Sequence, residues 1–422
     1  MSEPLSTEPY KGVRDFYPAD WARLSGVFTS IRTTLSTWGY QEYQASPMER
    51  AEIYESKTSE EIVNEQTYTF TDRGDRRVTL RPEMTPTLAR MVSAKRRELA
   101  FPLRWFSIGN RFRYERPQKG RLREFYQTDV DLIGLPEGEA DAEIISIAHA
   151  VFNSLGASDA DFTIQLNSRT LLNVAMNALS FTDEEQSGYL ALIDRKKKMS
   201  AEEFAQKRAP FERDGIDPLA LIEARTNLDV DGEYQKVLLL IQKLSARGIT
   251  NVVFDPSTVR GFLYYTGIVF EVFDTNTENP RALGGGGRYD GLVSLFGGDP
   301  IPAVGFAIGD VTLLDFLATH NLLPENTSAP QIYIGTPSKE DISAAVLFAA
   351  TLRSSGIRVF SNLTEKSLGD QIKDAVKRDI PYFIAYGSEE AAGKKVKIKE
   401  LATSSEKSLE KKKVADYVKK YA

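Results

Sequence analysis

The sequence reads Arg111-Phe112-Arg113-Tyr114-Glu115-Arg116-Pro117-Gln118-Lys119-Gly120-Arg121 across one strongly polar segment, and this segment with its flanks indicates the fold most directly. Residues 103–114 and 123–134 both alternate between apolar and polar side chains, which is the pattern of half-buried strands. The polar run between them, with its proline and glycine, predicts a long hairpin loop. An antiparallel pair of strands is therefore expected here.

The side chains of these two strands suggest a shared polar face. Residues of equal parity on a strand point to the same side, so Arg111 and Arg113 share one side of the first strand. Arg123, Gln127 and Asp131 share one side of the second. If the two sides coincide, two guanidinium groups, an amide and a carboxylate are presented together. Burying such a set is costly unless each member is paired, so the face is either an exposed, salt-bridged surface or a polar binding site.

A helix, a strand and a second helix are expected before the hairpin. Apolar residues recur at spacings of three and four over residues 21–38, which predicts one buried face of a long helix. Residues 77–81 have strand character. Thr85 and Pro86 then supply an N-cap and a first-turn proline for a helix that runs to about Lys95.

The chain changes character after the hairpin. Residues 168–246 are mostly helical and locally charged, so they are expected to form an insertion between two parts of the sheet. Strands return around 252–254 and 267–273. A glycine-rich turn at 284–287 and a strand–helix pair within 303–317 follow.

A polar, proline-containing linker at 322–329 precedes a different pattern. Beyond it, short apolar runs alternate with amphipathic helices, which is typical of a small α/β domain with a mostly parallel sheet. The expected domains are therefore 1–325, with the helical insertion at about 168–246, and 330–422.

The composition of the 422 residues excludes several kinds of site. There is no cysteine, which excludes disulfides, thiolate metal sites and cysteine nucleophiles. The only two histidines, His149 and His320, argue against a histidine-based zinc site or a Ser-His-Asp triad, so no protein metal site is expected. No apolar run approaches the roughly 18 residues of a membrane span, and the N-terminus has no apolar signal core. No membrane partner and a cytoplasmic location are therefore expected.

The charge is unevenly distributed along the chain. The net charge of −6 argues against indiscriminate nucleic-acid binding, yet residues 391–422 hold ten Lys against four Asp or Glu, a local charge of +6. Lysine-rich ends are usually solvated surface, and RNA binding is the alternative.

Three further segments could add polar groups to the face of the hairpin. The run Arg81-Pro82-Glu83-Met84-Thr85 offers a carboxylate and a hydroxyl at a helix N-terminus, although alone it is an ordinary cap. A second segment carries Arg260 and the adjacent Tyr264 and Tyr265, which on a regular strand would point to opposite faces. The glycine run at 284–291 is either a flexible turn or a close approach to a ligand. It is not a P-loop, because no Gly-Lys-Ser/Thr follows.

Several ordered motifs together resemble those of the histidyl-tRNA synthetases, a class II aminoacyl-tRNA synthetase family. The resemblance runs from about residue 8 to 402. Its segments are an N-terminal signature at 10–15, motif 1 with Gly39, Tyr40, Pro47 and Glu49, motif 2 and its loop at 111–121, and two histidine-specific segments at 260–270 and 285–291.

This resemblance implies an α+β class II catalytic domain, in which helices flank an antiparallel sheet, with a helical insertion and a C-terminal α/β anticodon-binding domain. It implies a ligase that activates histidine with ATP to histidyl-adenylate and transfers it to the 3′ end of tRNA(His). Mg²⁺ would accompany ATP, and motif 1 would form a homodimer interface. The lysine-rich C-terminal domain would then bind the anticodon arm.

The resemblance also implies roles for single residues in catalysis. Arg113 would contact the α-phosphate and the substrate carboxylate. Arg260 would act from the opposite side, as a fixed cation where other class II enzymes use a metal ion. Arg121 would bind the γ-phosphate of ATP. Arg116 and Gln118, on the motif 2 loop, would contact the acceptor end of the tRNA.

The implied amino-acid pocket combines residues from four segments. Glu83, Thr85 and Gln127 would accept hydrogen bonds from the α-ammonium, and Asp131 with one of the two adjacent tyrosines would orient the imidazole. The full set of expected substrate-binding residues is Glu83, Met84, Thr85, Gln127, Asp131, Tyr264, Tyr265 and Tyr289.

The chain departs from the family in three places. Leu263 stands where the family usually has Asp, and Gly284 stands where relatives commonly carry a larger residue, which would leave extra space. These two changes predict an altered amino-acid pocket. Motif 3 begins at 305–309, but the expected Glu-Arg pair reads Asp310-Val311, so the arginine that usually contacts ATP is missing. Arg288 is a conceivable substitute.

Two other functions fit parts of the pattern. A non-catalytic, synthetase-like regulatory subunit of histidine biosynthesis would be a binding protein, but such relatives typically lack the anticodon-binding domain and the Arg260 segment. A class II synthetase for proline, threonine or glycine would share a similar C-terminal domain. The adjacent tyrosines and the Gly-Arg-Tyr-Asp segment argue against it.

Overall fold

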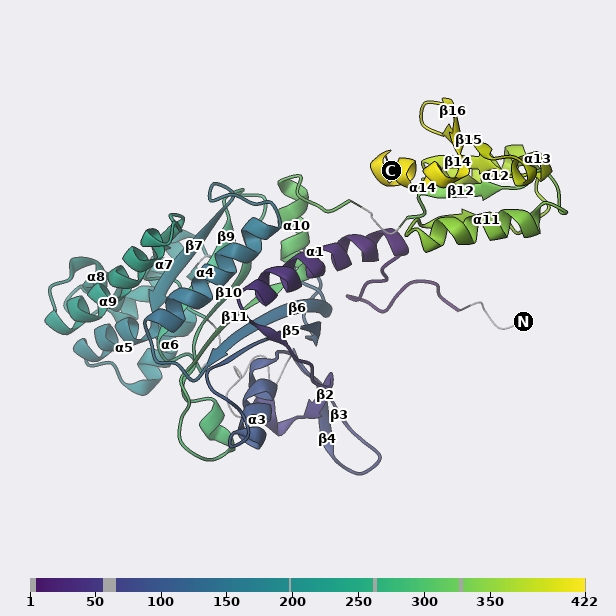
Figure 1. Ribbon diagram of the computed structural model, residues 1–422. Coiled ribbons are helices and arrows are strands. Elements are labelled where there is room, and N and C mark those ends of the chain that lie inside the picture. The colour runs from purple at the N-terminus through teal and green to yellow at the C-terminus, as the bar shows by residue number, and fades with distance from the viewer. Residues whose placement is uncertain (1–4, 56–65, 197–198, 261–263, 326–328, 422) are drawn as a thin grey trace. The chain divides into compact units, whose positions relative to one another are not determined.

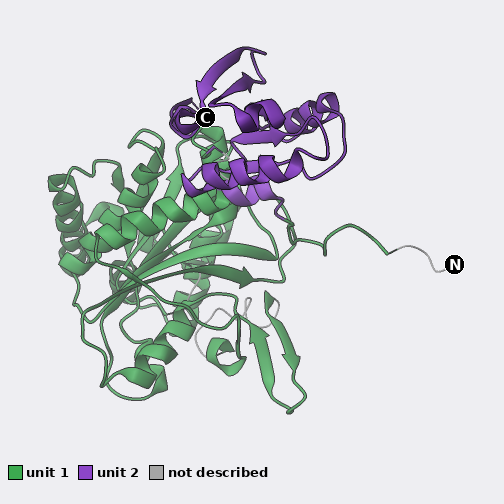
Figure 2. Cartoon of the chain, turned by 45° about the vertical axis from the view of Figure 1, so that its right-hand side comes forward, with its two compact units in different colours: residues 1–15, 24–324 green, residues 16–23, 325–422 purple. Residues whose placement is uncertain are grey.

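The computed structural model describes residues 5–55, 66–196, 199–260, 264–325 and 329–421. The chain forms two compact units, shown in green and purple in Figure 2. The first comprises Met1–Asp15 and Leu24–Pro324, and the second comprises Phe16–Arg23 and Glu325–Ala422. The domain limits of 1–325 and 330–422 remain predictions from the sequence.

An eight-stranded sheet forms the centre of the first unit (Figure 1). Its strands lie in the order β1 (Gln41–Glu42), β5 (Leu103–Phe112), β6 (Glu124–Ile133), β11 (Ala303–Gly309), β10 (Ala282–Arg288), β9 (Ile268–Asp274), β7 (Phe162–Ser168) and β8 (Val252–Phe254). The predicted hairpin is β5–β6, in a register that pairs Gly109 with Gln127. Only the edge strands β1 and β8 run parallel to their neighbours, so the sheet is mostly antiparallel, as predicted.

The glycine run is a strand inside the sheet, so the prediction of a turn at 284–287 is wrong. These residues lie in β10, hydrogen-bonded between β9 and β11. A Cβ on Gly285 would lie 2.4 Å from the Phe270 carbonyl oxygen, and one on Gly287 would lie 2.4 Å from that of Ile268. Composition indicated a turn because glycine is rare in strands. At these positions of the strand, however, the neighbouring backbones come so close that only glycine fits.

Helices cover one face of this sheet. In α1 (Pro18–Thr37), the central part of the predicted apolar face is buried, but Trp21 and Trp38 at its ends are 42% and 39% exposed. Phe28 of α1 packs against Tyr126 of β6, with ring centroids 5.6 Å apart. The helices α4 (Glu139–Ser154) and α10 (Asp310–Thr319) also contact β6. Because Tyr126 has even parity, the odd-numbered residues of β6 face the other side.

A small sheet leads into the helix predicted after residue 85. It has the strand order β2 (Met48–Arg50), β4 (Arg77–Leu80) and β3 (Tyr68–Thr71), with α2 (Glu52–Glu55) beside it. The helix α3 covers Thr85–Lys95, and Met84 is its N-cap without a side-chain hydrogen bond. The prediction that Thr85 is the N-cap is therefore wrong. The N-cap lies one residue earlier, because Thr85 is already helical.

The segment after β7 is mostly helical, as the fold class predicted. It contains α5 (Arg169–Ala178), α6 (Asp183–Asp194), α7 (Ala201–Arg208), the 3-10 helix η3 (Ala209–Phe211), α8 (Pro218–Ala224) and α9 (Leu228–Ala246). A further 3-10 helix, η4 (Val293–Phe296), lies between β10 and β11.

The second unit is an α/β domain around a five-stranded sheet. The strand order is β13 (Val359–Ser361), β12 (Ile332–Gly335), β14 (Tyr382–Ala385), β15 (Lys395–Glu400) and β16 (Glu406–Glu410). The first three strands are parallel, as expected, and the last two add an antiparallel hairpin that was not predicted. Its helices are α11 (Ile342–Ser354), α12 (Leu368–Lys377), α13 (Ser388–Ala392), η5 (Lys411–Lys413) and α14 (Val414–Tyr421).

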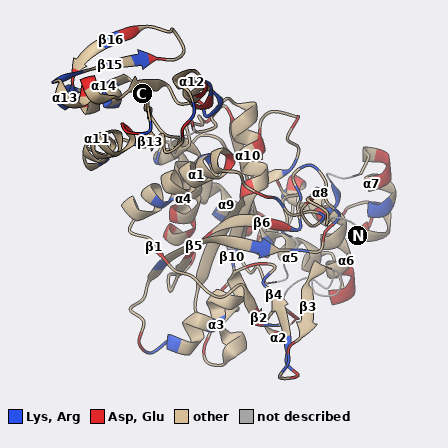
Figure 3. Cartoon of the chain, turned by 90° about the vertical axis from the view of Figure 1, so that its right-hand side faces the viewer, with Lys and Arg blue, Asp and Glu red and all other residues tan. Residues whose placement is uncertain are grey.

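The lysine-rich end is folded. In β15 the exposed Lys395 and Lys397 alternate with the buried Val396 and Ile398, and the basic strand is visible in Figure 3. The alternation explains how a charged segment joins a sheet: one face enters the core while the other stays solvated. Within the described part of the chain, no helix combines the length and apolarity needed to cross a membrane.

Candidate active site

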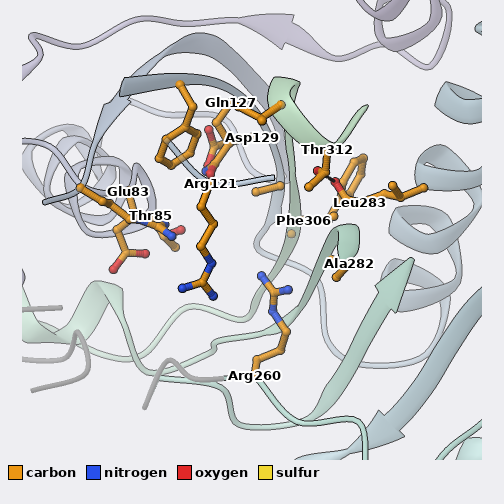
Figure 4. Close-up of a pocket in the computed structure, with 18 of the residues that line it drawn as sticks. Glu83, Thr85, Arg121, Gln127, Asp129, Arg260, Ala282, Leu283, Phe306 and Thr312 are labelled. Atoms are coloured by element: carbon orange, nitrogen blue, oxygen red, sulfur yellow. Dashed lines mark hydrogen bonds between the residues drawn. The ribbon is translucent and has the colours of Figure 1, made fainter. Parts of the chain in front are cut away.

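A cavity of about 220 Å³ opens on the face of the large sheet that the helices leave free (Figure 4). Strands β6, β10 and β11 contribute its floor, and the motif 2 loop and the start of α3 contribute its walls. It is lined by ten of the residues that the sequence predicted for the site: Glu83, Thr85, Arg113, Arg121, Gln127, Asp131, Arg260, Tyr264, Tyr265 and Tyr289.

The strand β6 supplies alternate residues to this cavity. Phe125, Gln127, Asp129 and Asp131 all line it, and the Gln127 Nε2 donates to Asp129 Oδ1 at 2.7 Å. Sequence reasoning missed Phe125 and Asp129, although the same parity rule covers both. Arg123 does not join them, because β6 begins at Glu124; its guanidinium instead stacks on the Tyr114 ring, 4.0 Å from the centroid.

Arg111 and Arg113 both lie on the cavity side of the sheet, since Arg111 is paired in register with Phe125, which lines the cavity, and Arg113 lines the cavity itself. Arg111 is fully buried and forms an ion pair with Asp129, so it holds the floor and does not line the cavity. Arg113 lies beyond Phe112, where β5 ends, and its Nε donates to the Pro82 carbonyl at 3.0 Å. Arg113 therefore reaches the cavity from just beyond the end of β5, whereas Arg111 is buried beneath its floor.

One end of the cavity carries two buried hydrogen-bonded pairs. The Tyr264 hydroxyl donates to Glu83 Oε2 at 2.8 Å, and the Tyr289 hydroxyl donates to Asp131 Oδ1. The rings of Tyr264 and Tyr289 meet edge to face, with centroids 6.0 Å apart. Burial raises the pKa of both phenols well above the usual value, so both remain donors. The backbone is irregular here, which lets the adjacent Tyr265 line the same cavity.

Asp131 has an unused oxygen in this network. Its Oδ2 is buried and has no hydrogen-bond partner among the described residues. Burial raises the pKa of the carboxyl to about 8, although the hydrogen bond from Tyr289 acts in the opposite direction; Asp129 raises it further. A ligand that brings an N–H group to Oδ2 would stabilise the ionised form.

The centre of the cavity carries three guanidinium groups. Arg121 Nη1 pairs with Glu115 Oε2 at 2.8 Å, and Arg260 Nη1 pairs with Glu271 Oε1 at 3.1 Å. Figure 4 shows Arg121 and Arg260 directed into the same space from opposite sides. Burial lowers the pKa of Arg113, an effect that Glu115 opposes. Converging guanidinium groups are the arrangement that binds phosphate oxygens.

Three predicted residues lie outside the cavity. Met84 is fully buried and its Sδ accepts from Arg81 Nη1 at 3.7 Å, so it does not line the cavity. Its neighbours Glu83 and Thr85 do line the cavity. Arg116 and Gln118 are exposed on the motif 2 loop. Their contact with tRNA stays a prediction.

The segment after motif 3 does not supply the missing arginine. Asp310 is buried, pairs with Arg14 Nη2 at 2.7 Å and accepts the Tyr126 backbone N–H at 3.0 Å. It thus ties the N-terminal signature to the sheet. The suggestion that Arg288 replaces the motif 3 arginine is wrong. Arg288 is buried outside the cavity and donates twice to Asp141 Oδ1, at 2.9 and 2.7 Å.

The two departures in the amino-acid segments have different outcomes. A Cβ on Gly284 would lie 2.6 Å from the Ala307 carbonyl oxygen and 2.8 Å from Ile308 Cγ1. The expected extra space at Gly284 is therefore absent, because β11 fills it. Leu263 lies outside the described residues. Within those residues, no group of three or more His, Asp or Glu side chains is arranged to hold a metal ion.

Comparison with known proteins decides the family. The sequence model of a family described as histidyl-tRNA synthetase matches residues 12–312, and one described as anticodon binding domain matches residues 331–421. The chain belongs to the histidyl-tRNA synthetase family. Members of this family are aminoacyl-tRNA synthetases, so the chain belongs to an enzyme family, as predicted.

Curated relatives of this family align along nearly the whole chain. A histidine–tRNA ligase of Leptospira biflexa is 37% identical over 416 residues, which cover 96% of this chain and 95% of the relative. One from Opitutus terrae is 38% identical over 413 residues, 94% of each chain. One from Thermococcus kodakarensis is 34% identical over 428 residues, 97% of each chain.

Solved structures confirm the predicted fold class. A histidyl-tRNA synthetase from Nostoc sp. PCC 7120 superposes with a TM-score of 0.77 at 22% identity, covering 98% of this chain and 99% of that one. A structure described as an ATP phosphoribosyltransferase regulatory subunit/histidyl-tRNA synthetase from Bacillus halodurans C gives 0.75 at 24% identity, covering 92% and 100%. At these identities the likeness shows the histidyl-tRNA synthetase fold, common to both descriptions.

Proposed function

We propose that this chain activates histidine with ATP and transfers the histidyl group to the 3′ end of tRNA(His). One observation carries the proposal: Arg113, Arg121 and Arg260 line a single cavity with a network of carboxylates and tyrosines. Cations suit a polyphosphate, and the acceptors beside them suit an amino acid with an ammonium and an N–H-bearing side chain.

In the first step, an oxygen of the histidine carboxylate attacks the α-phosphorus of ATP. A new P–O bond forms as the bond to the bridging oxygen breaks, and pyrophosphate leaves with that electron pair. Negative charge grows on the phosphate oxygens, which fixed guanidinium groups stabilise without reorganisation. In this proposal Arg113 and Arg260 hold the α-phosphate from two sides, and Arg121 binds the γ-phosphate.

Histidine would be recognised by the acceptors at the other end of the cavity. Glu83, Thr85 and Gln127 would accept from the α-ammonium, and the unpartnered Asp131 Oδ2 would accept an imidazole N–H. A pocket that pairs polar groups of its substrate discriminates by roughly 10⁴-fold against analogues that leave them unpaired. Tyr264 and Tyr289 orient the two carboxylates through their hydroxyl groups.

In the second step, a hydroxyl of the terminal ribose of the tRNA attacks the carbonyl carbon of histidyl-adenylate. The ester forms, the hydroxyl proton passes to a phosphate oxygen of the adenylate, and AMP leaves with the electrons of the mixed-anhydride bond. The exposed Arg116 and Gln118 would contact the acceptor end, and the anticodon-binding domain would hold the anticodon arm.

Mg²⁺ would enter with ATP. Such ions are usually bound by one or two carboxylates together with substrate phosphates. Glu115 is a carboxylate that lines the nucleotide end of the cavity and fits this role. When bound, the ion would neutralise part of the charge on the leaving pyrophosphate. We also propose a homodimer that uses the motif 1 segment, in the cytoplasm.

A regulatory, non-catalytic role is the alternative. The anticodon-binding domain and the inward-directed Arg260 favour the enzyme, since neither has a purpose in a subunit that only binds a phosphoribosyltransferase. The amino-acid preference remains part of the proposal, because Leu263 still predicts a changed pocket.

The test is ATP–pyrophosphate exchange across the standard amino acids and histidine analogues, followed by charging of purified tRNA(His). Exchange that depends on histidine, together with charging, is expected. Exchange with another amino acid alone would overturn the histidine assignment. No exchange, with tight binding to a phosphoribosyltransferase, would favour the regulatory alternative.

A further inference from the structure

A second cavity lies beside the first. Its volume is also about 220 Å³, and the two share Gly120, Leu283 and Thr312 in their linings. The second cavity is bounded by the tip of the motif 2 loop and by the segment that leads into β10, which carries Arg281. It therefore extends the site from Arg121 toward the motif 3 helix, α10.

Arg281 connects this segment to the loop. Its Nε donates to the Lys119 carbonyl at 3.0 Å, and the Lys119 Nζ donates to the Glu278 carbonyl at 3.1 Å. These bonds use only one of the Arg281 nitrogens. Within the described residues, its two terminal nitrogens have no hydrogen bond or ion pair, including to Asp315, which lines the same cavity.

Arg281 and Thr312 approach the same point of the loop. A Cβ built on Gly120 would lie 2.7 Å from Arg281 Cδ and 3.4 Å from Thr312 Cγ2. Thr312 is the third residue of the segment that lacks the usual Glu-Arg pair, and it lines both cavities. Arg281 therefore brings a guanidinium, from the residue just before β10, to the place that a long side chain at position 312 of α10 would reach.

We propose that Arg281 binds the terminal phosphate of ATP together with Arg121, in place of the arginine that motif 3 lacks. The inference rests on the proposed use of ATP. Burial and then repulsion by Arg121 lower the pKa of Arg281, an effect that Glu115, the ion-pair partner of Arg121, opposes. A phosphate between them removes this repulsion and supplies acceptors for the terminal nitrogens of Arg281.

Arg281→Ala tests the proposal in pyrophosphate exchange. The KM for ATP is expected to rise about 10- to 100-fold, the loss expected for a charge-assisted hydrogen bond. The KM for histidine should change less than about twofold. Arg96→Ala is the matched control, since Arg96 is also half-buried and donates to a backbone carbonyl, that of Asp299, at 2.7 Å.

A rescue variant separates phosphate binding from the loop contact. Arg281→Ala with Thr312→Arg moves the guanidinium to α10 without restoring the bond to Lys119. Recovery of most of the ATP KM supports the proposal. An Arg281→Ala enzyme with an ATP KM within about twofold of wild type overturns it. An Arg281→Ala enzyme in which kcat and both KM values are altered, and which Thr312→Arg does not rescue, also overturns it.

Calorimetric binding of ATP and AMP keeps this test independent of the proposed reaction. Arg281→Ala should weaken ATP binding about 10-fold or more and AMP binding less than about twofold. Equal weakening of both nucleotides would contradict a contact to the terminal phosphate. If the wild-type protein binds ATP but shows no histidine-dependent exchange, the proposed function is refuted. The contact of Arg281 with the terminal phosphate can still be tested by nucleotide binding.

Discussion

The two ends of the main cavity are built on different principles. At the amino-acid end, Glu83, Tyr264, Tyr289 and Asp131 are hydrogen-bonded in pairs and buried. At the nucleotide end, arginines pair with carboxylates that line the same region, as Arg121 does with Glu115. The first end is preorganised for one small ligand. In the proposed mechanism, the arginines at the second end exchange their carboxylate partners for phosphate oxygens when ATP binds.

The difference predicts which substitutions affect which substrate. Changes at the nucleotide end should alter the reaction rate and the KM for ATP, because they remove charge that acts on the phosphates. Changes at the amino-acid end should alter the KM for histidine. A variant that fails to separate the two would contradict the division of the cavity.

Arg260→Ala is expected to have the largest effect. In the proposed mechanism Arg260 faces the reacting phosphorus, so its removal should lower kcat for pyrophosphate exchange about 10²- to 10³-fold. Arg104→Ala is the matched control, because Arg104 forms a comparable pair with Glu143, at 2.8 Å, outside the cavity. Loss of exchange in both variants to the same extent would indicate a general folding defect.

Tyr264→Phe should have an intermediate effect at the other end. The variant leaves the buried Glu83 without the phenol donor, which should raise the KM for histidine about 10-fold and leave the KM for ATP unchanged. Tyr189→Phe removes a similar hydroxyl, one that donates to Asp217 in the helical insertion, and should alter neither KM. Equal increases in the KM for histidine and the KM for ATP in Tyr264→Phe would contradict the division of the cavity into two ends.

The last prediction concerns stability against pH and not kinetics. The pKa of Asp131 is raised to about 8 in the folded chain, so the folded state holds a proton that the unfolded state releases near pH 4. The free energy of unfolding should therefore fall as pH rises from about 4 to 8, by at most about 1.4 kcal/mol per pH unit from this group.

Urea unfolding at a series of pH values measures this contribution. Asp131→Asn should remove it, so the difference in unfolding free energy between variant and wild type should grow in favour of the variant up to pH 8. Substitution of the exposed Asp416 by Asn serves as the control. Parallel pH curves for wild type and Asp131→Asn would mean that the ionised carboxylate is not disfavoured by burial.

The sequence alone reached much of this arrangement because its motifs constrain local structure. The alternation of apolar and polar residues predicted β5 and β6. The same parity rule, applied to every odd-numbered residue of β6, would also have predicted that Asp129 and Phe125 line the cavity. The errors occurred where local pattern and tertiary contact disagree. The glycines at 284–287, which composition assigns to a turn, form a central strand. Arg288, which was considered for ATP binding, instead forms a buried ion pair with Asp141.

By itself, the sequence determined the fold class, the helical insertion and the chemical groups available to the site, because periodicity and motif order depend on the chain alone. The tertiary structure decided which of those groups share a cavity. Whether Arg111, Arg113, Arg281 or Arg288 meets a ligand or a buried carboxylate depends on where each strand ends and which distant residue packs beside it. Those contacts join residues far apart in the chain, and no local pattern encodes them.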